Sequence, residues 1–207
     1  QRGVEVRLLV SDDGSTDSTV DLLARWSASD PRIRVLPRRQ GEAGGAGNFL
    51  HLFTTHDPDG SFVAFSDQDD VWHPDKLSRQ LELMRSRGAD VVSSNVMAFR
   101  CDEDGSVRDR HLIRKSGPQR RWDYIFEAAG PGSTYVFSPD AHRRLVGALA
   151  GLDPTGIDVH DWYLYALARA LGATWVIGEE PTLEYRQHDS NVQGANSGAG
   201  VSDPTPR

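Results

Sequence analysis

Residues 62–75 read FVAFSDQDDVWHPD, and this stretch indicates the fold class most clearly. The apolar run Phe62–Phe65 is short and rich in aromatic and β-branched residues, which predicts a buried β-strand. Three carboxylates follow the run within four positions, and the proline after them fits the first turn of a helix. Apolar residues then recur at helical spacing, at Leu77, Leu81 and Met84. A buried strand that leads through a polar loop into a helix is the repeating unit of an α/β protein.

The same order of strand, loop and helix recurs along the chain. The segment VEVRLLV (4–10) predicts a strand that ends in the loop SDDGSTD (11–17), and a helix is expected to follow. Further strands are expected at 33–36, 91–92, 133–137, 175–177 and 183–185, and further helices at 49–53, 139–150 and 161–171. Residues 102–121 are polar and are expected to form a loop, with a turn at Asp104–Gly105. We therefore predict an α/β fold in which helices flank a mostly parallel central sheet, with ligands at the carboxyl ends of the strands.

Composition excludes several classes of protein. The chain has 207 residues, of which 38% are hydrophobic and 26% charged, and this balance is typical of a packed domain rather than a disordered chain. Its net charge of −7 argues against non-specific nucleic-acid binding. Cys101 is the only cysteine, so an internal disulfide and a multi-cysteine metal site are excluded, and a reducing compartment is expected. No apolar run approaches the ~20 residues that span a bilayer.

Two acidic loops follow predicted strands. At Asp12 and Asp13, a turn with a helix cap explains one carboxylate but not two in succession, whereas a carboxylate there could accept a hydrogen bond from a nucleobase N–H. Asp67, Asp69 and Asp70 form the second loop, where clustered like charges are costly unless a cation neutralises them. Mg²⁺ and Mn²⁺ are suitable cations, because both take oxygen ligands and share them with substrate phosphates. A solvated acidic turn is the alternative interpretation.

Two later segments also combine polar groups with strand ends or helix starts. In the segment HDW (160–162), Asp161 is either the N-cap of a helix or a base aimed into a cleft. In the segment YRQH (185–188), His188 is either structural or a ligand, and histidine suits Mn²⁺ better than Mg²⁺. All four constellations lie where a single cleft of an α/β protein would place them.

The segments SDDGSTD, SDQDDVWHPDK, HDWYLYALARALG and YRQHDSN occur in the order found in family-2 glycosyltransferases. From about Val4 to Gly194 the chain resembles the bacterial rhamnosyltransferase-like branch of that family, and SDQDDVW and YRQH are the more specific of the motifs. The resemblance implies an A-type glycosyltransferase fold. It also implies inverting, metal-dependent transfer from a nucleotide sugar, with dTDP-rhamnose as the favoured donor.

The resemblance further implies roles for single residues. Those expected to contact the nucleotide are Asp12, Asp13, Arg39, Asn48 and Asp67. Asp69 matches the second carboxylate of the Asp-x-Asp motif and is expected to bind Mg²⁺ or Mn²⁺ together with His188. Asp161 falls on the position of the catalytic base. Trp72 and Trp162 are candidate walls of the acceptor pocket, and core packing is the alternative for both.

One departure from the family's pattern concerns the domain boundaries. Family members open with a strand that carries a Thr-Tyr-Asn-like motif, and this chain has no counterpart of it. We therefore expect an N-terminally truncated catalytic domain over residues 1–194. Residues 195–207 are rich in Gly, Ser and Pro and are expected to form a disordered tail.

The expected partners are a nucleotide-sugar donor and a glycan or lipid-linked glycan acceptor in bacterial cell-surface polysaccharide synthesis, with no nucleic acid. Such an acceptor implies a cytoplasmic enzyme at the inner face of the cell membrane. Two other hypotheses stay open. A non-catalytic nucleotide- or glycan-binding module would explain the missing strand. A metal-dependent phosphohydrolase or nucleotidyltransferase would explain the acidic cluster but leaves the HDW segment without a role.

Overall fold

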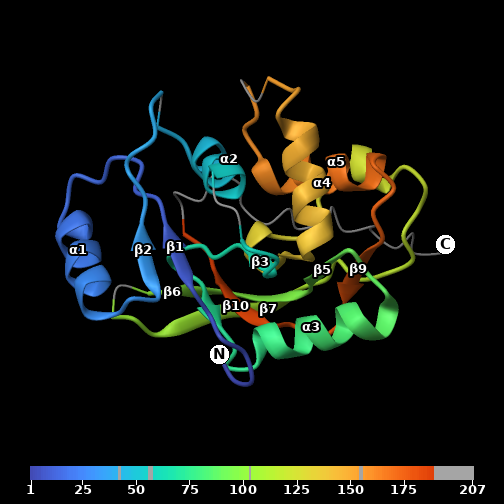
Figure 1. Ribbon diagram of the computed structural model, residues 1–207. Helices are drawn as coiled ribbons and strands as arrows, with labels where there is room; N and C mark the ends of the chain where they lie inside the picture. Colours follow the sequence, from blue (N-terminus) through green and yellow to red (C-terminus); the bar gives the residue numbers. More distant parts are fainter. Residues whose placement is uncertain (42, 56–57, 103, 154–155, 189–207) are drawn as a thin grey trace.

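The computed structural model describes residues 1–188 except 42, 56–57, 103 and 154–155 (Figure 1). The tail expected over 195–207 lies outside the described residues. The helices are α1 (Thr19–Ser29), α2 (Gly45–Thr55), α3 (Lys76–Arg87), α4 (Pro139–Leu149) and α5 (His160–Ala170), and two short 3₁₀ turns are η1 (Asp123–Ile125) and η2 (Gly132–Thr134). The strands are β1 (Leu8–Val10), β2 (Ile33–Val35), β3 (Val63–Ala64), β4 (Val71–Trp72), β5 (Val91–Ser94), β6 (Val96–Cys101), β7 (Val107–Ile113), β8 (Val136–Phe137), β9 (Trp175–Gly178) and β10 (Leu183–Arg186).

The described strands form three small sheets with mixed pairing. β1 and β2 pair in parallel, and the two larger sheets have the orders β4-β10-β6-β7 and β3-β8-β5-β9. Within these, β10 with β6 and β5 with β9 are parallel, and the other neighbours are antiparallel. The predicted α/β architecture is confirmed. The central sheet is mixed rather than mostly parallel, because β8 runs opposite to both of its neighbours.

The core lies on both faces of the β3-β8-β5-β9 sheet. Because successive side chains of a strand point to opposite faces, Val91 and Phe137 pack toward α2, α4 and α5, whereas Val92 and Val136 pack toward α3. Figure 1 shows this layering, with the three helices on one side of the sheet and α3 on the other. The sheet therefore holds α2 and α5, which carry candidate site residues, on the same face.

The predicted loop over residues 102–121 is wrong in its first half. β6 and β7 form an antiparallel hairpin whose turn includes Gly105 at φ 82°, so the expected turn at Asp104–Gly105 is present. β7 is exposed over nearly its whole length and therefore lacks the alternation of apolar and polar residues that marks a half-buried strand. β7 is held as a strand by its backbone pairing with β6. The polarity of its residues gives no sign of this pairing.

Two other elements differ from the expectation. The first strand is shorter than predicted and begins at Leu8, and Val71–Trp72 form a short strand that pairs with β10. The pairing of β4 with β10 closes the acidic loop at 66–70 into a tight connection between two sheets. None of the helices in the described part of the chain has the length and apolar character needed to cross a membrane.

Candidate active site

The acidic loop after β3 meets the chain that leaves β10. The carboxylate Oδ2 of Asp69 lies 2.8 Å from Nε2 of His188, although 119 residues separate the two in sequence. The guanidinium Nε of Arg186 donates to the Asp69 carbonyl over 3.1 Å. The two residues predicted to bind a metal are therefore in direct contact.

Asp67 lies in the same loop and is the most perturbed of its carboxylates. Burial raises its pKa to about 7, and the negative charges of Asp70, Asp69 and Asp161 add to the effect. A hydrogen bond with Ser133 opposes it. The structure thus brings the predicted base Asp161 into electrostatic range of the acidic loop, as a single cleft requires.

Asp70 links three elements. Its carboxylate accepts a hydrogen bond from the Ser133 hydroxyl at 2.6 Å and from the Arg186 backbone N–H at 3.1 Å. Burial raises its pKa to about 6, against these two hydrogen bonds. Asp70 therefore fixes β10 and η2 to the loop that presents Asp67 and Asp69, a role that the sequence alone did not indicate.

Asp161 lies in the first turn of α5 and is held in place by the backbone. Its carboxylate accepts hydrogen bonds from the Gly132 N–H at 3.1 Å and from the Trp162 N–H at 2.6 Å. Burial nevertheless raises the pKa of Asp161. A carboxylate with a raised pKa is a stronger base than an exposed one, which suits proton abstraction from a hydroxyl.

The neighbourhood of Asp161 is tightly packed. A methyl group at Gly132 would lie 2.8 Å from His160 Nε2 and 3.2 Å from Asp161 Cβ, so only glycine fits there without displacement. The His160 ring stacks on Phe49 of α2, with ring centroids 4.2 Å apart. This stack joins α5 to α2, the helix that carries the predicted nucleotide contact Asn48.

The loop after β1 forms a second group of predicted residues. Asp12 accepts hydrogen bonds from the backbone N–H groups of Gly14 and Ser15 and from the Ser15 hydroxyl, so it shapes its own turn. Asp13 instead contacts the segment between β2 and α2. Its carboxylate accepts a hydrogen bond from the Arg39 guanidinium at 2.9 Å and another from the Gly44 N–H at 2.6 Å. Burial opposes ionisation, but these two donors hold the pKa of Asp13 below its usual value.

Asn48 anchors the start of α2 to the end of β1. Its side-chain oxygen accepts from the Ser11 hydroxyl at 2.6 Å, and its amide donates to the Ser11 carbonyl at 2.9 Å. The predicted nucleotide contacts Asp13, Arg39 and Asn48 are therefore linked around β1 and α2. Phe49, the residue after Asn48, packs edge-on against Phe65, which directly precedes the acidic loop, with ring centroids 5.3 Å apart.

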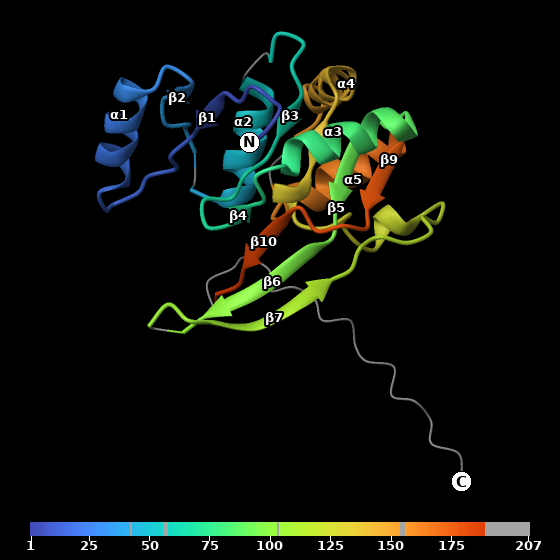
Figure 2. The same ribbon diagram turned by 90° about the horizontal axis from the view of Figure 1, so that it is seen from below.

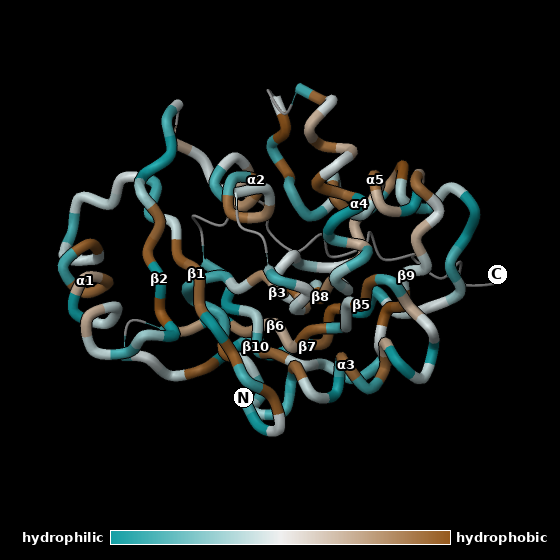
Figure 3. The backbone as a smooth tube through the Cα atoms, viewed as in Figure 1, coloured by the Kyte–Doolittle hydropathy of each residue, from teal (hydrophilic) through white to brown (hydrophobic). Residues whose placement is uncertain are grey.

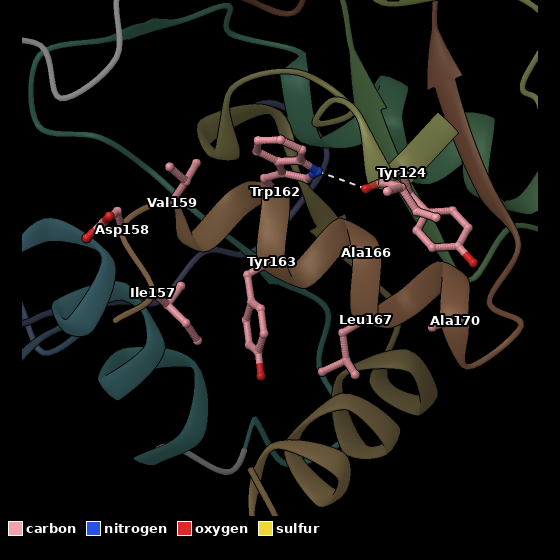
Figure 4. Close-up of a pocket in the computed structure, with 10 residues that line it drawn as sticks. Tyr124, Ile157, Asp158, Val159, Trp162, Tyr163, Ala166, Leu167 and Ala170 are labelled. Atoms are coloured by element: carbon pink, nitrogen blue, oxygen red, sulfur yellow. Dashed lines mark hydrogen bonds between the residues drawn. The ribbon is translucent and has the colours of Figure 1, made fainter. Parts of the chain in front are cut away.

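The two tryptophans predicted for the acceptor pocket occupy different surroundings. Trp162 lines an apolar hollow of about 570 Å³ on α5, and its indole N–H donates to the Tyr124 carbonyl at 2.8 Å (Figure 4). Tyr163 and Leu167 project from the same helix toward the lower side of the view. Trp72 lies against the buried Lys76, whose Nζ is 4.2 Å from the ring centre. Only Trp162 has the open apolar neighbourhood of a pocket wall in this structure.

Lys76 is a buried residue to which the sequence assigned no role. It is fully buried, donates to Gln80 Oε1 at 2.7 Å, and has a pKa lowered to about 7 by burial, against the attraction of Asp70. Gln80 in turn donates to the Thr134 carbonyl at 2.6 Å. Both lie four positions apart on α3, just after the acidic motif, and this spacing is the signal that could have identified them.

A divalent cation fits the chemistry of the acidic loop. In the described part of the chain, no three His, Cys, Asp or Glu side chains are grouped so as to hold a metal by themselves. The pair of Asp69 and His188 nevertheless offers a carboxylate and an imidazole, a combination that suits Mn²⁺ better than Mg²⁺, and substrate phosphates and water would supply the other ligands. Burial and the charges of neighbouring carboxylates raise the pKa of Asp67 beside this pair, and a bound cation would offset both effects.

Comparisons with known proteins identify the family of the chain. The family model described as "Glycosyl transferase family 2" matches residues 1–145. The protein named dTDP-rhamnosyl transferase RfbG of Shigella flexneri is 36% identical over 95% of this chain and 68% of its own length. An uncharacterised glycosyltransferase of Nostoc is 30% identical over 93% of this chain, which spans 58% of that relative.

Solved structures show the same fold at low sequence identity. TarS of S. aureus in complex with UDP-GlcNAc matches 89% of this chain and 50% of its own, with a TM-score of 0.62 and 15% identity. A mannosyltransferase of Pyrobaculum calidifontis with GDP-Man and Mn²⁺ matches 87% of this chain and 47% of its own, with a TM-score of 0.52 and 19% identity. The chain thus spans about half the length of each of these structures.

Proposed function

The chain belongs to glycosyl transferase family 2, and from this membership we propose that it transfers L-rhamnose from dTDP-rhamnose, with inversion, to a glycan hydroxyl in bacterial cell-surface polysaccharide synthesis. The observation that carries the proposal is the position of Asp161: the Gly132 N–H donates to Asp161 at 3.1 Å, and the hydroxyl of the next residue, Ser133, donates to Asp70 of the acidic loop at 2.6 Å. A base beside an acidic loop that can hold a cation for the donor diphosphate is the arrangement that sugar transfer needs.

The choice of donor rests on the comparison with the Shigella protein. That relative is named a dTDP-rhamnosyl transferase, and its likeness extends over 95% of this chain. The nucleotide would lie along the group made by Asp13, Arg39 and Asn48, with Asp12 shaping the loop and Asp67 at the far end. An acceptor carboxylate in this group suits the N3–H donor of a thymine base.

Asp161 would take the proton of the acceptor hydroxyl as that oxygen attacks the anomeric carbon. The bond from this carbon to the diphosphate breaks, and attack from the opposite face inverts the configuration. The anomeric carbon passes through an oxocarbenium-like state. Gly132 and Trp162 hold the carboxylate by their N–H groups, so its orientation is set before the substrates bind.

Asp69 and His188 would hold the divalent cation, Mg²⁺ or Mn²⁺. When bound, the cation supplies positive charge that stabilises the negative charge developing on the leaving diphosphate. Asp70 contributes indirectly, because its hydrogen bonds with Ser133 and Arg186 position the loop. Trp162 is the better candidate for a wall of the acceptor pocket, and Trp72 remains a second candidate.

We propose a lipid-linked glycan as the acceptor, which places the protein in the cytoplasm at the inner face of the cell membrane. The catalytic domain is proposed to comprise residues 1–194.

The alternative function is a non-catalytic nucleotide- or glycan-binding module. The presence of all three residues, the paired Asp69 and His188 and the buried Asp161, favours the enzyme.

Two substitutions separate the base from the metal-binding loop. Asp161→Asn should lower kcat by roughly 10²- to 10⁴-fold, the usual contribution of a general base, and leave the donor Kd unchanged. Asp69→Ala should weaken Mn²⁺-dependent binding of the donor as well as turnover. The measurement is transfer of labelled rhamnose from dTDP-rhamnose to a lipid-linked glycan, together with donor titrations.

Asp21→Asn is the matched control, because Asp21 is an exposed carboxylate on α1, away from the acidic loop. It should retain wild-type turnover, and far-ultraviolet circular dichroism should show the same fold in all three variants. Retained turnover in Asp161→Asn would refute the assignment of the base. Tight nucleotide binding without any turnover by the wild type would favour the binding module.

A further inference from the structure

A basic and apolar edge extends from the end of β7 to η1. Residues 114–126 contain four basic side chains and one acidic one, in a chain whose net charge is −7. Arg114, Arg120 and Arg121 are exposed, and in the described part of the chain none of them forms an ion pair with a carboxylate. This stretch is therefore a local reversal of the protein's overall charge.

Large apolar side chains lie beside these arginines and face solvent. Trp122 is 52% exposed, Ile125 is 55% exposed and Phe126 is 78% exposed. The Arg121 guanidinium carbon lies 5.0 Å from the centre of the Trp122 ring. Large apolar residues that gather on a surface mark an interaction site, because isolated ones are common but clusters are rare on soluble domains.

Hydrogen bonds to a buried side chain fix the start of this edge, at Lys115 and Ser116, to the core. Asn95 is buried, and its oxygen accepts from the backbone N–H groups of Lys115 and Ser116 at 2.7 and 2.8 Å. Its amide donates to the Ser116 hydroxyl and to the Glu179 carbonyl. Three of these four hydrogen bonds hold the segment that leads into the exposed arginines, and the fourth fixes Asn95 to the loop after β9.

The other end of the edge is fixed to α5. Arg169 of that helix donates to Asp123 at 3.0 Å and to the Arg120 carbonyl at 3.2 Å, and Trp162 donates to the Tyr124 carbonyl. Figures 1 and 2 both place η1 and the loop before it at the margin of the molecule beside α5 and β9, away from α1. Figure 3 shows hydrophilic residues along this margin. Residues 120–124 of the edge are therefore held against α5, the helix that carries Asp161.

From these observations we propose that residues 114–126 dock on an anionic lipid bilayer. Arginines interact with acidic headgroups, while tryptophan and other apolar side chains enter the boundary between headgroups and acyl chains. Charge favours an anionic bilayer as the partner of residues 114–126. A negatively charged surface complements their basic side chains, and the net charge of the chain is −7. The biological purpose of this docking rests on the proposed lipid-linked acceptor. The docking itself does not depend on it, since lipid binding needs no sugar transfer.

The experiment is co-sedimentation of the full chain with vesicles of phosphatidylcholine alone and of phosphatidylcholine mixed with phosphatidylglycerol. Binding should require phosphatidylglycerol and should fall as salt screens the charges. Arg120→Gln with Arg121→Gln should lower the partition coefficient at least tenfold, since each basic residue near an anionic surface contributes appreciably. Phe126→Ser should lower it as well, but with less dependence on salt.

Matched controls lie at the opposite end of the molecule. Arg25→Gln with Arg34→Gln removes two exposed charges near α1 and β2, and Val20→Ser removes an exposed apolar side chain of α1. Both should bind vesicles like the wild type. Equal loss in the controls, or no binding to acidic vesicles by the wild type, would overturn the proposal. So would a dimer in solution that Phe126→Ser dissociates, because the edge would then be a subunit interface. Sugar transfer in detergent, measured separately, would show whether the proposed function stands when vesicle binding fails.

Discussion

His160 is a single residue that makes the folded state sensitive to pH. Burial lowers its pKa to about 4 from 6.5, and its ring lies against Phe49. Between these two pKa values the unfolded chain binds a proton at this position and the folded protein does not. The stabilisation is therefore complete above pH 6.5, declines as the pH falls below 6.5 and is fully lost once the pH has fallen through about 4.

Replacement of His160 by phenylalanine should flatten this dependence. Between pH 6.5 and 4 the wild type should lose up to about 3 kcal/mol of unfolding free energy that His160→Phe retains. Urea unfolding at a series of pH values measures the difference in slope, which a constant packing penalty does not affect. His111→Phe, a change at an exposed position, should follow the wild type. Parallel curves for wild type and His160→Phe would contradict the prediction.

Among the helices and strands, the sequence predicts the ones that bury an apolar face and misses the ones that are exposed to solvent. The strand at Phe62–Phe65 was expected from its continuous apolar run, and the helix after it from the helical spacing of Leu77, Leu81 and Met84. β7 was missed because it is exposed, and its order comes from pairing with β6. β8 was expected as a strand, but its antiparallel direction follows from the path of the chain through η2, which no local pattern encodes.

The contact between η2 and the first turn of α5 leaves no space for a methyl group. Gly132→Ala should push its Cβ against His160 and Asp161, and displacement of a base by about 1 Å can lower turnover 10²-fold. We expect a lower kcat, an unchanged donor Kd and a loss of about 1–3 kcal/mol of stability from overpacking. Gly147→Ala on α4, where no neighbour lies within 4 Å, should instead stabilise the helix by about 0.5–1 kcal/mol. Equal turnover in the two variants would refute the positional role of Gly132.

At the scale of the molecule, the candidate site is partly predictable because strand ends converge. Asp67, Asp69, Asp161 and His188 were expected in one cleft, and the contact of Asp69 with His188 over 119 residues agrees with that expectation. Asp70 was expected only as part of the acidic turn. Its partners lie on η2 and β10, and such long-range hydrogen bonds leave no local pattern in the sequence.

Nucleotide binding should test whether the two halves of the site act together. The Asp13–Arg39 pair and the Asp69–His188 pair belong to different elements, and a nucleoside diphosphate with a divalent cation would bridge them. Binding to the folded state alone raises stability by ~2.7 kcal/mol when the ligand is at a hundredfold excess over Kd. Thermal unfolding with dTDP, UDP or GDP, each with Mn²⁺ or with EDTA, should show the largest shift for dTDP with Mn²⁺. Asp69→Ala should lose the Mn²⁺-dependent part of this shift and Asp21→Asn should keep it. A shift that is equal in EDTA would contradict the metal site, and a larger shift with UDP or GDP would contradict the rhamnose donor.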